Sequence, residues 1–335
     1  MTAPLLEIRN VSKRFAQPAG LIERGIARLT GTRAGAVVHA LTGIDLTVPR
    51  GQVLGIVGES GCGKSTLGRI VAGVYGPTGG EVLLDGAPVA RERGGATEKL
   101  TTRVQMIHQD PFASLNPRMK VGETIAEGPR VNGIASGPEM RRRTGELLEQ
   151  VGLEAGYADR FPHQFSGGQR QRIAIARALA MQPDLLVLDE AVASLDVSIQ
   201  AQVLNLFTDL RRDLGLTALF ISHDLSVVRH VCDRVAIMYL GRMVELAGAR
   251  ELYDNPRHPY TRALFDSIPT LGTGRAQFHP IKGEIPSPLN PPSGCAFHPR
   301  CPLAGPRCKV ETPRLIPALS GSAVACHLHD GGTGQ

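Results

Sequence analysis

The segment Gly58-Glu59-Ser60-Gly61-Cys62-Gly63-Lys64-Ser65, followed by Thr66, decides how this 335-residue chain folds. It fits the pattern G-x-x-x-x-G-K-[ST] between an apolar run and a helical pattern. Glycines let the backbone wrap a polyphosphate, and the helix N-terminus adds partial positive charge. We expect Lys64 to reach the β- and γ-phosphates and the Ser65 hydroxyl to bind Mg²⁺, which prefers hard oxygen ligands. We call residues 58–65 the phosphate loop, in which Cys62 is expected to act through its backbone alone.

A second part of such a site follows the apolar run 185–188, which ends in Asp189 and Glu190. A buried strand that delivers an Asp beside a phosphate loop holds Mg²⁺ in nucleotide hydrolases. The adjacent Glu190 is a candidate general base for the attacking water. The two segments together predict a site that binds and hydrolyses a nucleoside triphosphate.

Strand and helix patterns alternate along the first 255 residues, which predicts an α/β fold with a largely parallel sheet. Strands are expected at 5–9, 44–57 (with Pro49-Arg50-Gly51 as a turn), 81–84, 103–108, 185–189, 217–222 and 234–240. Helices are expected at 64–74, 138–151, 168–181 and 198–214, the second and third forming a helical insertion over about 110–180.

The helical pattern over 198–214 is the clearest in the chain. One face is predicted to carry Ile199, Val203, Leu206, Leu210 and Leu214, with Gly215 as the C-terminal cap.

Composition excludes several classes of protein. Hydrophobic residues make up 42% of the chain, enough for a folded core, but no run of 18 apolar residues predicts a membrane span. No signal peptide is expected from the N-terminal sequence. The net charge of +6 is compatible with an anionic ligand, but the absence of Trp and an aromatic content of 4% argue against a platform for single-stranded nucleic acid. We expect no nucleic-acid partner.

A third motif narrows the family. The segment Phe165-Ser166-Gly167-Gly168-Gln169 resembles the LSGGQ signature of ATP-binding cassette (ABC) ATPases, with Phe in place of the leading Leu. Ser166 is placed to cap a helix whose glycine amides can bind phosphate. The resemblance implies a cassette that binds ATP and Mg²⁺, and it implies that this segment completes the ATP site of the opposite subunit in a head-to-tail dimer.

Other landmarks of the cassette occur in the family's order. Gln109 resembles the Q-loop residue that contacts Mg²⁺, Asp196 lies in a segment similar to the D-loop, and His223 resembles the switch histidine at the γ-phosphate. Phe15 resembles the aromatic residue that stacks on adenine, although the segment 16–38 intervenes before the next strand. That segment is interpreted as a solvated surface excursion, with a helix that contacts a membrane or partner as the alternative.

The sequence departs from the common cassette pattern after Glu190, where Ala191-Val192 replaces Pro-Thr. The catalytic acid is retained, so ATP hydrolysis is still expected.

Three further segments narrow the subfamily. Residues 109–119, 196–202 and 256–262, the last reading Pro-Arg-His-Pro-Tyr-Thr-Arg, resemble oligopeptide and dipeptide importer ATPases, in particular the second (F-type) subunit of a heterodimeric pair. The resemblance implies a nucleotide-binding domain over 1–255 and a C-terminal extension over 256–335.

The implied function is to couple ATP hydrolysis to solute uptake at the cytoplasmic face of the cell membrane. The implied partners are a second ATPase subunit (a D-type paralogue or a second copy), two transmembrane permease subunits and an extracytoplasmic solute-binding protein. The alternatives for the solute are nickel, an opine or another small molecule. A soluble cassette protein that acts on DNA or ribosomes is disfavoured because the chain has one cassette and no long insertion.

The extension is rich in proline and cysteine: it holds 13 of the 24 prolines and Cys295, Cys301, Cys308 and Cys326. The spacing C-x5-C-x6-C-x17-C is loose for structural zinc. Four thiolates could hold a [4Fe–4S] cluster, which takes four Cys ligands, and the resemblance associates such tails with a cluster. An iron–sulfur cluster, zinc and unligated thiols are the three alternatives. Cys232, elsewhere in the chain, is expected to be a small buried hydrophobic residue.

Overall fold

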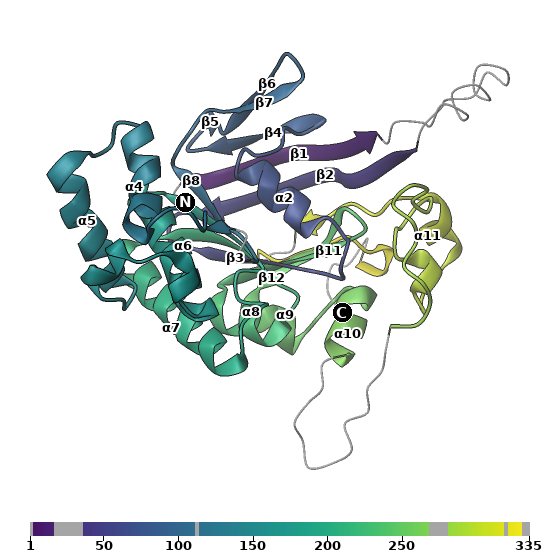
Figure 1. Ribbon diagram of the computed structural model, residues 1–335. Coiled ribbons are helices and arrows are strands. Elements are labelled where there is room, and N and C mark those ends of the chain that lie inside the picture. The colour runs from purple at the N-terminus through teal and green to yellow at the C-terminus, as the bar shows by residue number, and fades with distance from the viewer. Residues whose placement is uncertain (1–2, 17–35, 111–113, 268–280, 318–320, 330–335) are drawn as a thin grey trace, which may run out of the picture.

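An eight-stranded sheet carries the phosphate loop at the centre of the molecule (Figure 1). The computed structural model describes residues 3–16, 36–110, 114–267, 281–317 and 321–329. The strands, in spatial order, are β13 (Ile316–Pro317), β14 (Ala323–Val324), β12 (Arg242–Gly248), β11 (Arg234–Tyr239), β3 (Val53–Val57), β10 (Thr217–Ile221), β9 (Leu185–Asp189) and β8 (Val104–Ile107). Strands β11, β3, β10, β9 and β8 are parallel, as the alternating pattern predicts, and the other three are antiparallel.

A second, antiparallel sheet lies above the first. Its order is β2 (Val37–Pro49), β1 (Pro4–Ala16), β4 (Gly79–Leu84) and β5 (Ala87–Pro88), and the hairpin β6 (Ala90–Arg93) to β7 (Ala96–Lys99) follows it. Helix α2 (Lys64–Val71) lies between the two sheets (Figure 1). One hydrophobic cluster, which includes Leu6, Leu67 and Val187, fills this space.

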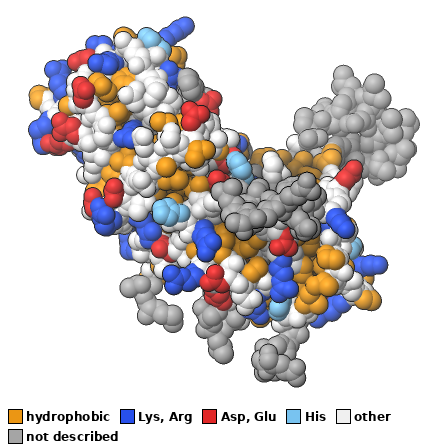
Figure 2. Space-filling model, turned by 90° about the horizontal axis from the view of Figure 1, so that it is seen from below, with side chains coloured by type: hydrophobic (Ala, Val, Ile, Leu, Met, Phe, Trp, Pro, Cys, Tyr) orange, Lys and Arg blue, Asp and Glu red, His pale blue; other side chains and the backbone are white. Residues whose placement is uncertain are grey.

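Helices cover the other face and one side of the central sheet. The side group consists of α4 (Val121–Val131), α5 (Gly137–Gln150) and α6 (Gly167–Ala180), with short 3-10 helices at Ala155–Asp159 and Pro162–Gln164. The face is covered by α7 (Val197–Leu214), α8 (Leu225–Val231) and α9 (Ala249–Asp254), and α10 (Pro259–Asp266) follows. Seen from below, the described surface mixes apolar side chains with charged ones of both signs (Figure 2).

The strands alternate between two cores. On β9, Leu185 and Val187 belong to the upper hydrophobic cluster, whereas Leu186 and Leu188 belong to the lower one beneath the sheet. All five residues of the strand are buried. Burial on both faces explains why the sequence reads as a continuous apolar run instead of an alternating one.

The helical insertion contains one helix more than the sequence predicts. Helix α4 precedes the two expected helices, and its sequence VGETIAEGPRV contains Gly122, Gly128 and Pro129, which weaken a helical pattern. Tertiary packing compensates, because Val121 and Ile125 are fully buried. Local propensity alone therefore misses an element that its contacts stabilise.

Helix α7 starts and ends close to the predicted residues, but its buried face is displaced. Gly215 adopts the left-handed conformation (φ 62°), which confirms it as the cap. Leu214 is 45% exposed, contrary to the prediction, while Leu204 and Phe207 are buried.

Strand β12 and the hairpin β6–β7 were not predicted either. The hairpin lies at an exposed edge with little apolar pattern. Most of the excursion predicted at 16–38 falls at 17–35, outside the described residues. Of its two ends, residue 16 closes β1, and β2 begins at Val37.

The C-terminal extension joins the main core. Strand β14 pairs with β12 and thereby lengthens the central sheet. Phe297, which is 1% exposed, packs against Tyr239 of β11 and Tyr260 of α10, with ring centroids 5.2 and 5.3 Å apart. The 3-10 turns His298–Arg300 and His327–His329 and helix α11 (Pro306–Val310) complete it. No helix in the described part of the chain is long and apolar enough to cross a membrane.

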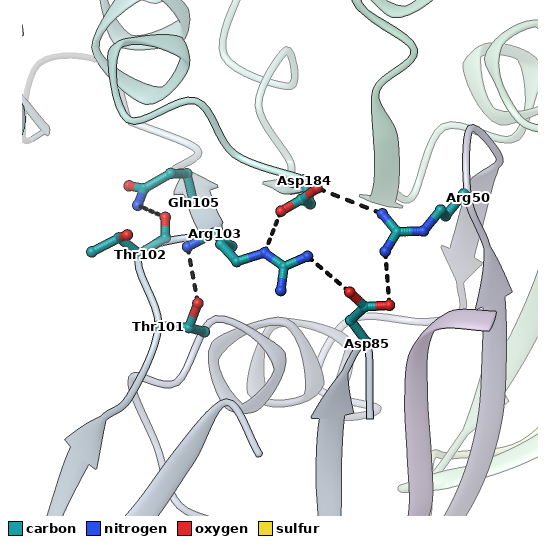
Figure 3. Close-up of polar contacts among 7 residues, drawn as sticks. All are labelled: Arg50, Asp85, Thr101, Thr102, Arg103, Gln105 and Asp184. Carbon is teal, nitrogen blue, oxygen red and sulfur yellow. Dashed lines mark hydrogen bonds and ion pairs between the residues drawn. The ribbon is translucent and has the colours of Figure 1, made fainter. Parts of the chain in front are cut away.

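Four charged side chains tie the two sheets together at the edge opposite the phosphate loop (Figure 3). Asp85, after β4, contacts Arg50 at 2.7 Å and Arg103 at 3.2 Å. Asp184, before β9, contacts the same two arginines. The two aspartates and two arginines alternate around a ring, so each charge lies between two of opposite sign. Such a network stabilises the fold more than isolated surface ion pairs do.

Asp85 is expected to make the stability of the fold depend on pH. Hydrogen bonds from Arg50, and then from Arg103, lower the pKa of this carboxyl. Such a group stabilises the folded state above its unfolded pKa, and the contribution is lost as the pH falls through its folded pKa. Asp85→Asn should lower Tm near neutral pH, and this loss of Tm should shrink progressively as the pH falls below the unfolded pKa of about 3.9.

The control for Asp85→Asn is Asp159→Asn, whose side chain is 88% exposed at a single 3.4 Å contact with Lys120. Thermal unfolding across this pH range compares the two variants with the unmodified chain. An equal Tm loss for both, or a loss for Asp85→Asn that persists in acid, would contradict the prediction.

Candidate active site

The phosphate loop connects β3 to α2 in a conformation that requires glycine. Gly63, the residue before α2, has φ 107°, which side-chain-bearing residues rarely adopt. A Cβ on Gly58 would lie 2.2 Å from the carbonyl oxygen of Met238. The loop is therefore held between β2 and β11, where no side chain fits, and its glycines leave room for phosphate to approach the backbone.

Lys64 and Ser65 begin helix α2 and meet the acidic end of β9. Lys64 is 5% exposed, and its Nζ donates to the carbonyl oxygens of Gly58 (2.8 Å) and Glu59 (3.1 Å). The Ser65 hydroxyl donates to Oδ1 of Asp189 at 2.8 Å. A hydroxyl and a carboxylate at one point fit the hard oxygen ligands that Mg²⁺ takes. Ser65 and Asp189, two of the three residues predicted to contact Mg²⁺, thus lie together beside the loop.

Glu190 and His223 lie side by side at the carboxyl ends of β9 and β10. The two side chains approach to 3.4 Å between Oε2 and Nδ1. The Glu190 N–H donates to Ile221 O at 2.9 Å, and Glu190 itself has φ 50°. This strained, anchored backbone directs the carboxylate toward the histidine. The arrangement brings the predicted general base and the predicted γ-phosphate contact to one point.

The Q-loop and D-loop segments contact each other. Ser194 Oγ donates to the carbonyl oxygen of Gln109 at 3.2 Å, although the two residues lie 85 positions apart. The Gln109 side chain is exposed. Asp196 is also exposed and immediately precedes α7. Residues 111–113 of the extended Q-loop segment lie outside the described residues.

The signature segment caps helix α6 as predicted. Ser166 Oγ accepts from the Gln169 N–H (3.3 Å), and Gln169 Oε1 accepts from the Ser166 N–H (3.0 Å), which is a capping box. Gly168 is buried, and a Cβ there would lie 2.3 Å from Ile199. Phe165 is 5% exposed and packs against Tyr157, so Phe fills the position of the usual Leu. Ser166 itself faces the surface.

Phe15 lies on β1, near the end of the strand. Its ring packs edge-on against Tyr75 with centroids 5.8 Å apart, and Lys13 Nζ lies 5.3 Å from its centre. The ring is half-buried, which leaves part of it accessible. Stacking of adenine on Phe15 stays a prediction.

Two other loop residues show different roles. Cys62 is 6% exposed, and burial raises the pKa of its thiol, so the side chain stays neutral while its backbone carbonyl accepts from Gly241 at 2.9 Å. The Glu59 carboxylate pairs with Arg300 of the extension, with Nη–Oε distances of 2.7 and 3.0 Å. Its N–H donates to Tyr260 Oη at 3.0 Å.

Arg300 and Tyr260 were missed as site residues. Both follow the cassette in sequence, and no local pattern links them to a loop about 200 positions earlier. The sequence carried two weak signals: Tyr260 lies in the segment 256–262, and Arg300 precedes Cys301 in the cysteine-rich tail.

The four late cysteines lie near one another. The Cys295 N–H donates to the Cys308 carbonyl oxygen at 2.8 Å. Burial raises the pKa of Cys295 to about 11, with smaller contributions from the other three thiols. Within the residues that the structure describes, however, no group of three or more His, Cys, Asp or Glu side chains is arranged to hold a metal ion. The structure therefore does not support the iron–sulfur cluster or the zinc alternative.

Cys232 is 7% exposed and packs against Gly55, which confirms its prediction as a small buried hydrophobic residue.

Comparison with known families and proteins agrees with these geometries. Residues 41–193 match the ABC transporter family, and residues 244–308 match the oligopeptide/dipeptide transporter C-terminal region. The oligopeptide transport ATP-binding protein AppF of Bacillus subtilis is 48% identical over 97% of each chain. A probable peptide ABC transporter ATP-binding protein of Sinorhizobium fredii is 46% identical over 98% of this chain and 91% of its own.

Solved structures show the same fold. The cbiO1 subunit of a Clostridium perfringens ABC transporter complex superposes with a TM-score of 0.60 at 28% identity, over 76% of this chain and 92% of its own. A dimeric ATP-binding cassette in a post-hydrolysis state with ADP and phosphate gives a TM-score of 0.59 at 28% identity, over 73% and 99%.

Gly58→Ala is expected to damage both the fold and the loop. The new Cβ would overlap the Met238 carbonyl, at a cost of about 2 kcal/mol or more in unfolding free energy. Gly79→Ala is the control, because a Cβ there meets no atom within 4 Å. Urea unfolding measures both variants, and equal stabilities would show that the tight fit at Gly58 is not required.

Proposed function

The chain belongs to the ABC transporter ATP-binding proteins of the oligopeptide and dipeptide type, and we propose that it hydrolyses ATP at the phosphate loop to drive peptide uptake. The observation that carries the proposal is the convergence of Lys64, Ser65, Asp189, Glu190 and His223 at the carboxyl ends of adjacent parallel strands. This edge is where open α/β sheets bind ligands.

Each residue has a chemical role in the proposed reaction. Lys64 exchanges its bonds to the loop carbonyls for the β- and γ-phosphate oxygens, while Ser65 and Asp189 hold Mg²⁺. Glu190 accepts a proton from the attacking water, and His223, 3.4 Å away, contacts the γ-phosphate. Mg²⁺ supplies neutralisation of the phosphate charge when it is bound.

We propose that two cassettes must associate for hydrolysis. Ser166 and Asp196 are exposed, so they are accessible to a second chain. Val197, beside Asp196, is 83% exposed, so an apolar side chain at the same surface is accessible to that chain as well. The second cassette is a D-type paralogue or another copy of this chain, and each signature segment caps the ATP bound to the other.

The membrane subunits have a candidate docking groove. It is open, with a volume of about 790 Å³, and is lined by residues of β8, α4 and α6. Three of its lining residues are large apolar side chains exposed to solvent: Val74 (50%), Leu100 (40%) and Val131 (76%). His108, next to Gln109, also lines the groove. An apolar segment of a permease subunit seated here would lie beside the Q-loop, and this position supports a coupling role.

The proposal extends to location and solute. The cassette would bind peripherally to the cytoplasmic face of the cell membrane through two permease subunits, with an extracytoplasmic solute-binding protein delivering the solute. The names of the relatives favour peptides over nickel or opines.

Glu190→Gln tests the reaction. The variant keeps the shape of the side chain and loses the base, so hydrolysis should fall about 100-fold or more while ATP binding persists. A strain that lacks the chain should recover uptake of labelled peptides with the unmodified protein and not with the variant. Hydrolysis near the normal rate in the variant would remove Glu190 from the role of base.

Val131→Glu tests the groove. A charge on this apolar surface should reduce co-purification with the permease subunits by about tenfold while ATP binding is unchanged. Val310→Glu is the matched control, because Val310 is 79% exposed on α11 of the extension. Equal recovery of both variants with the permease would exclude the groove as the docking site.

A further inference from the structure

We propose that Arg300 of the C-terminal extension is a positioning residue for ATP, which neutralises and holds Glu59 of the phosphate loop and thereby sets the affinity of the loop for the polyphosphate. The inference rests on the phosphate role proposed above for residues 58–65. The proposal gives the C-terminal extension a role in nucleotide binding. This role depends neither on which solute is transported nor on a metal at the four late cysteines.

The contact is bidentate and buried on the arginine side. Arg300 Nη1 and Nη2 lie 2.7 and 3.0 Å from the two carboxylate oxygens of Glu59. The side chain of Arg300 is 4% exposed and that of Glu59 is 20% exposed. A planar guanidinium that meets both oxygens fixes the orientation of the carboxylate as well as its charge.

The extension also fixes the position of Arg300. Its guanidinium lies 3.4 Å from Tyr239 Oη, and its Nε donates to the Lys282 carbonyl oxygen at 3.3 Å. Phe297, three residues earlier, is anchored between Tyr239 and Tyr260. The cation is thus held rigidly at one place and does not depend on a flexible surface side chain.

Three residues hold Glu59 of the phosphate loop, one through its side chain and two through its backbone. Arg300 binds the carboxylate, Tyr260 Oη accepts the N–H at 3.0 Å, and Lys64 Nζ donates to the carbonyl oxygen at 3.1 Å. Lys64 is the residue that must meet the phosphates. The residue that Arg300 holds is therefore one hydrogen bond from the cation that binds ATP.

The charges of the pair determine whether each substitution strengthens or weakens ATP binding. The phosphates of ATP are anionic, and an unpaired carboxylate in the loop would repel them in an environment that screens poorly. Arg300 cancels that charge. Loss of Arg300 leaves the Glu59 carboxylate uncompensated, whereas loss of Glu59 leaves the positive charge of Arg300 uncompensated next to the phosphate loop. The two changes break the same ion pair but should move ATP affinity in opposite directions.

The experiment measures the Kd of a fluorescent ATP analogue with Mg²⁺ for the purified full-length chain. Arg300→Met should raise Kd by about tenfold, a factor that corresponds to about 1.4 kcal/mol. Glu59→Gln should lower Kd, and the double variant should bind more tightly than Arg300→Met. Arg307→Met is the matched control, because it removes a cation of the same extension from an exposed pair with Glu311. It should leave Kd unchanged.

A purely structural pair gives a different pattern. Weaker binding in Arg300→Met and Glu59→Gln alike, without recovery in the double variant, would overturn the proposal, as would an Arg300→Met protein that binds like the unmodified chain. Thermal unfolding of each variant accompanies the titration. If Arg300→Met does not fold, Glu59→Gln decides: a lower Kd supports the proposal, and an equal or higher Kd overturns it. Failure of the unmodified chain to bind the analogue would count instead against the proposed ATP site.

Discussion

The hydrogen bond from Ser65 to Asp189, 2.8 Å long, joins the start of α2 to the end of β9, and the rest of the site depends on it. It requires the parallel register that sets Asp189 opposite Ile221 of β10 and Ile221 opposite Ile56 of β3. Because the carboxyl ends of these strands meet at one edge, the loop after each strand contributes a different group. A shift of one residue in that register would direct these side chains to the wrong face.

The C-terminal extension shows how a small, proline-rich segment is stabilised by packing against a larger domain. Its four cysteines left an iron–sulfur cluster, zinc and unligated thiols as alternatives. The structure places Phe297 and β14 in the core and sheet of the cassette, so hydrophobic burial stabilises the extension. The same packing brings Arg300 to Glu59. The extension thus contacts the phosphate loop because it shares the core of the larger domain.

The helical side of the molecule shows a second consequence of packing. Helix α4 forms despite two glycines and a proline, because Val121 and Ile125 are buried against its neighbours. The same arrangement exposes Val131 in the groove beside His108. A segment with low intrinsic helix propensity thus forms part of the groove proposed as the docking site of the membrane subunits.

The sequence by itself determined the parts of this protein whose chemistry is local. The phosphate loop, the acidic end of β9 and the capped signature helix can each be read from a few consecutive residues, since backbone conformation and capping depend on near neighbours. Tertiary structure alone decided which distant groups meet. The pairing of Glu59 with Arg300, 241 positions apart, follows from the packing of aromatic rings and from strand register, and no periodicity in the sequence encodes either.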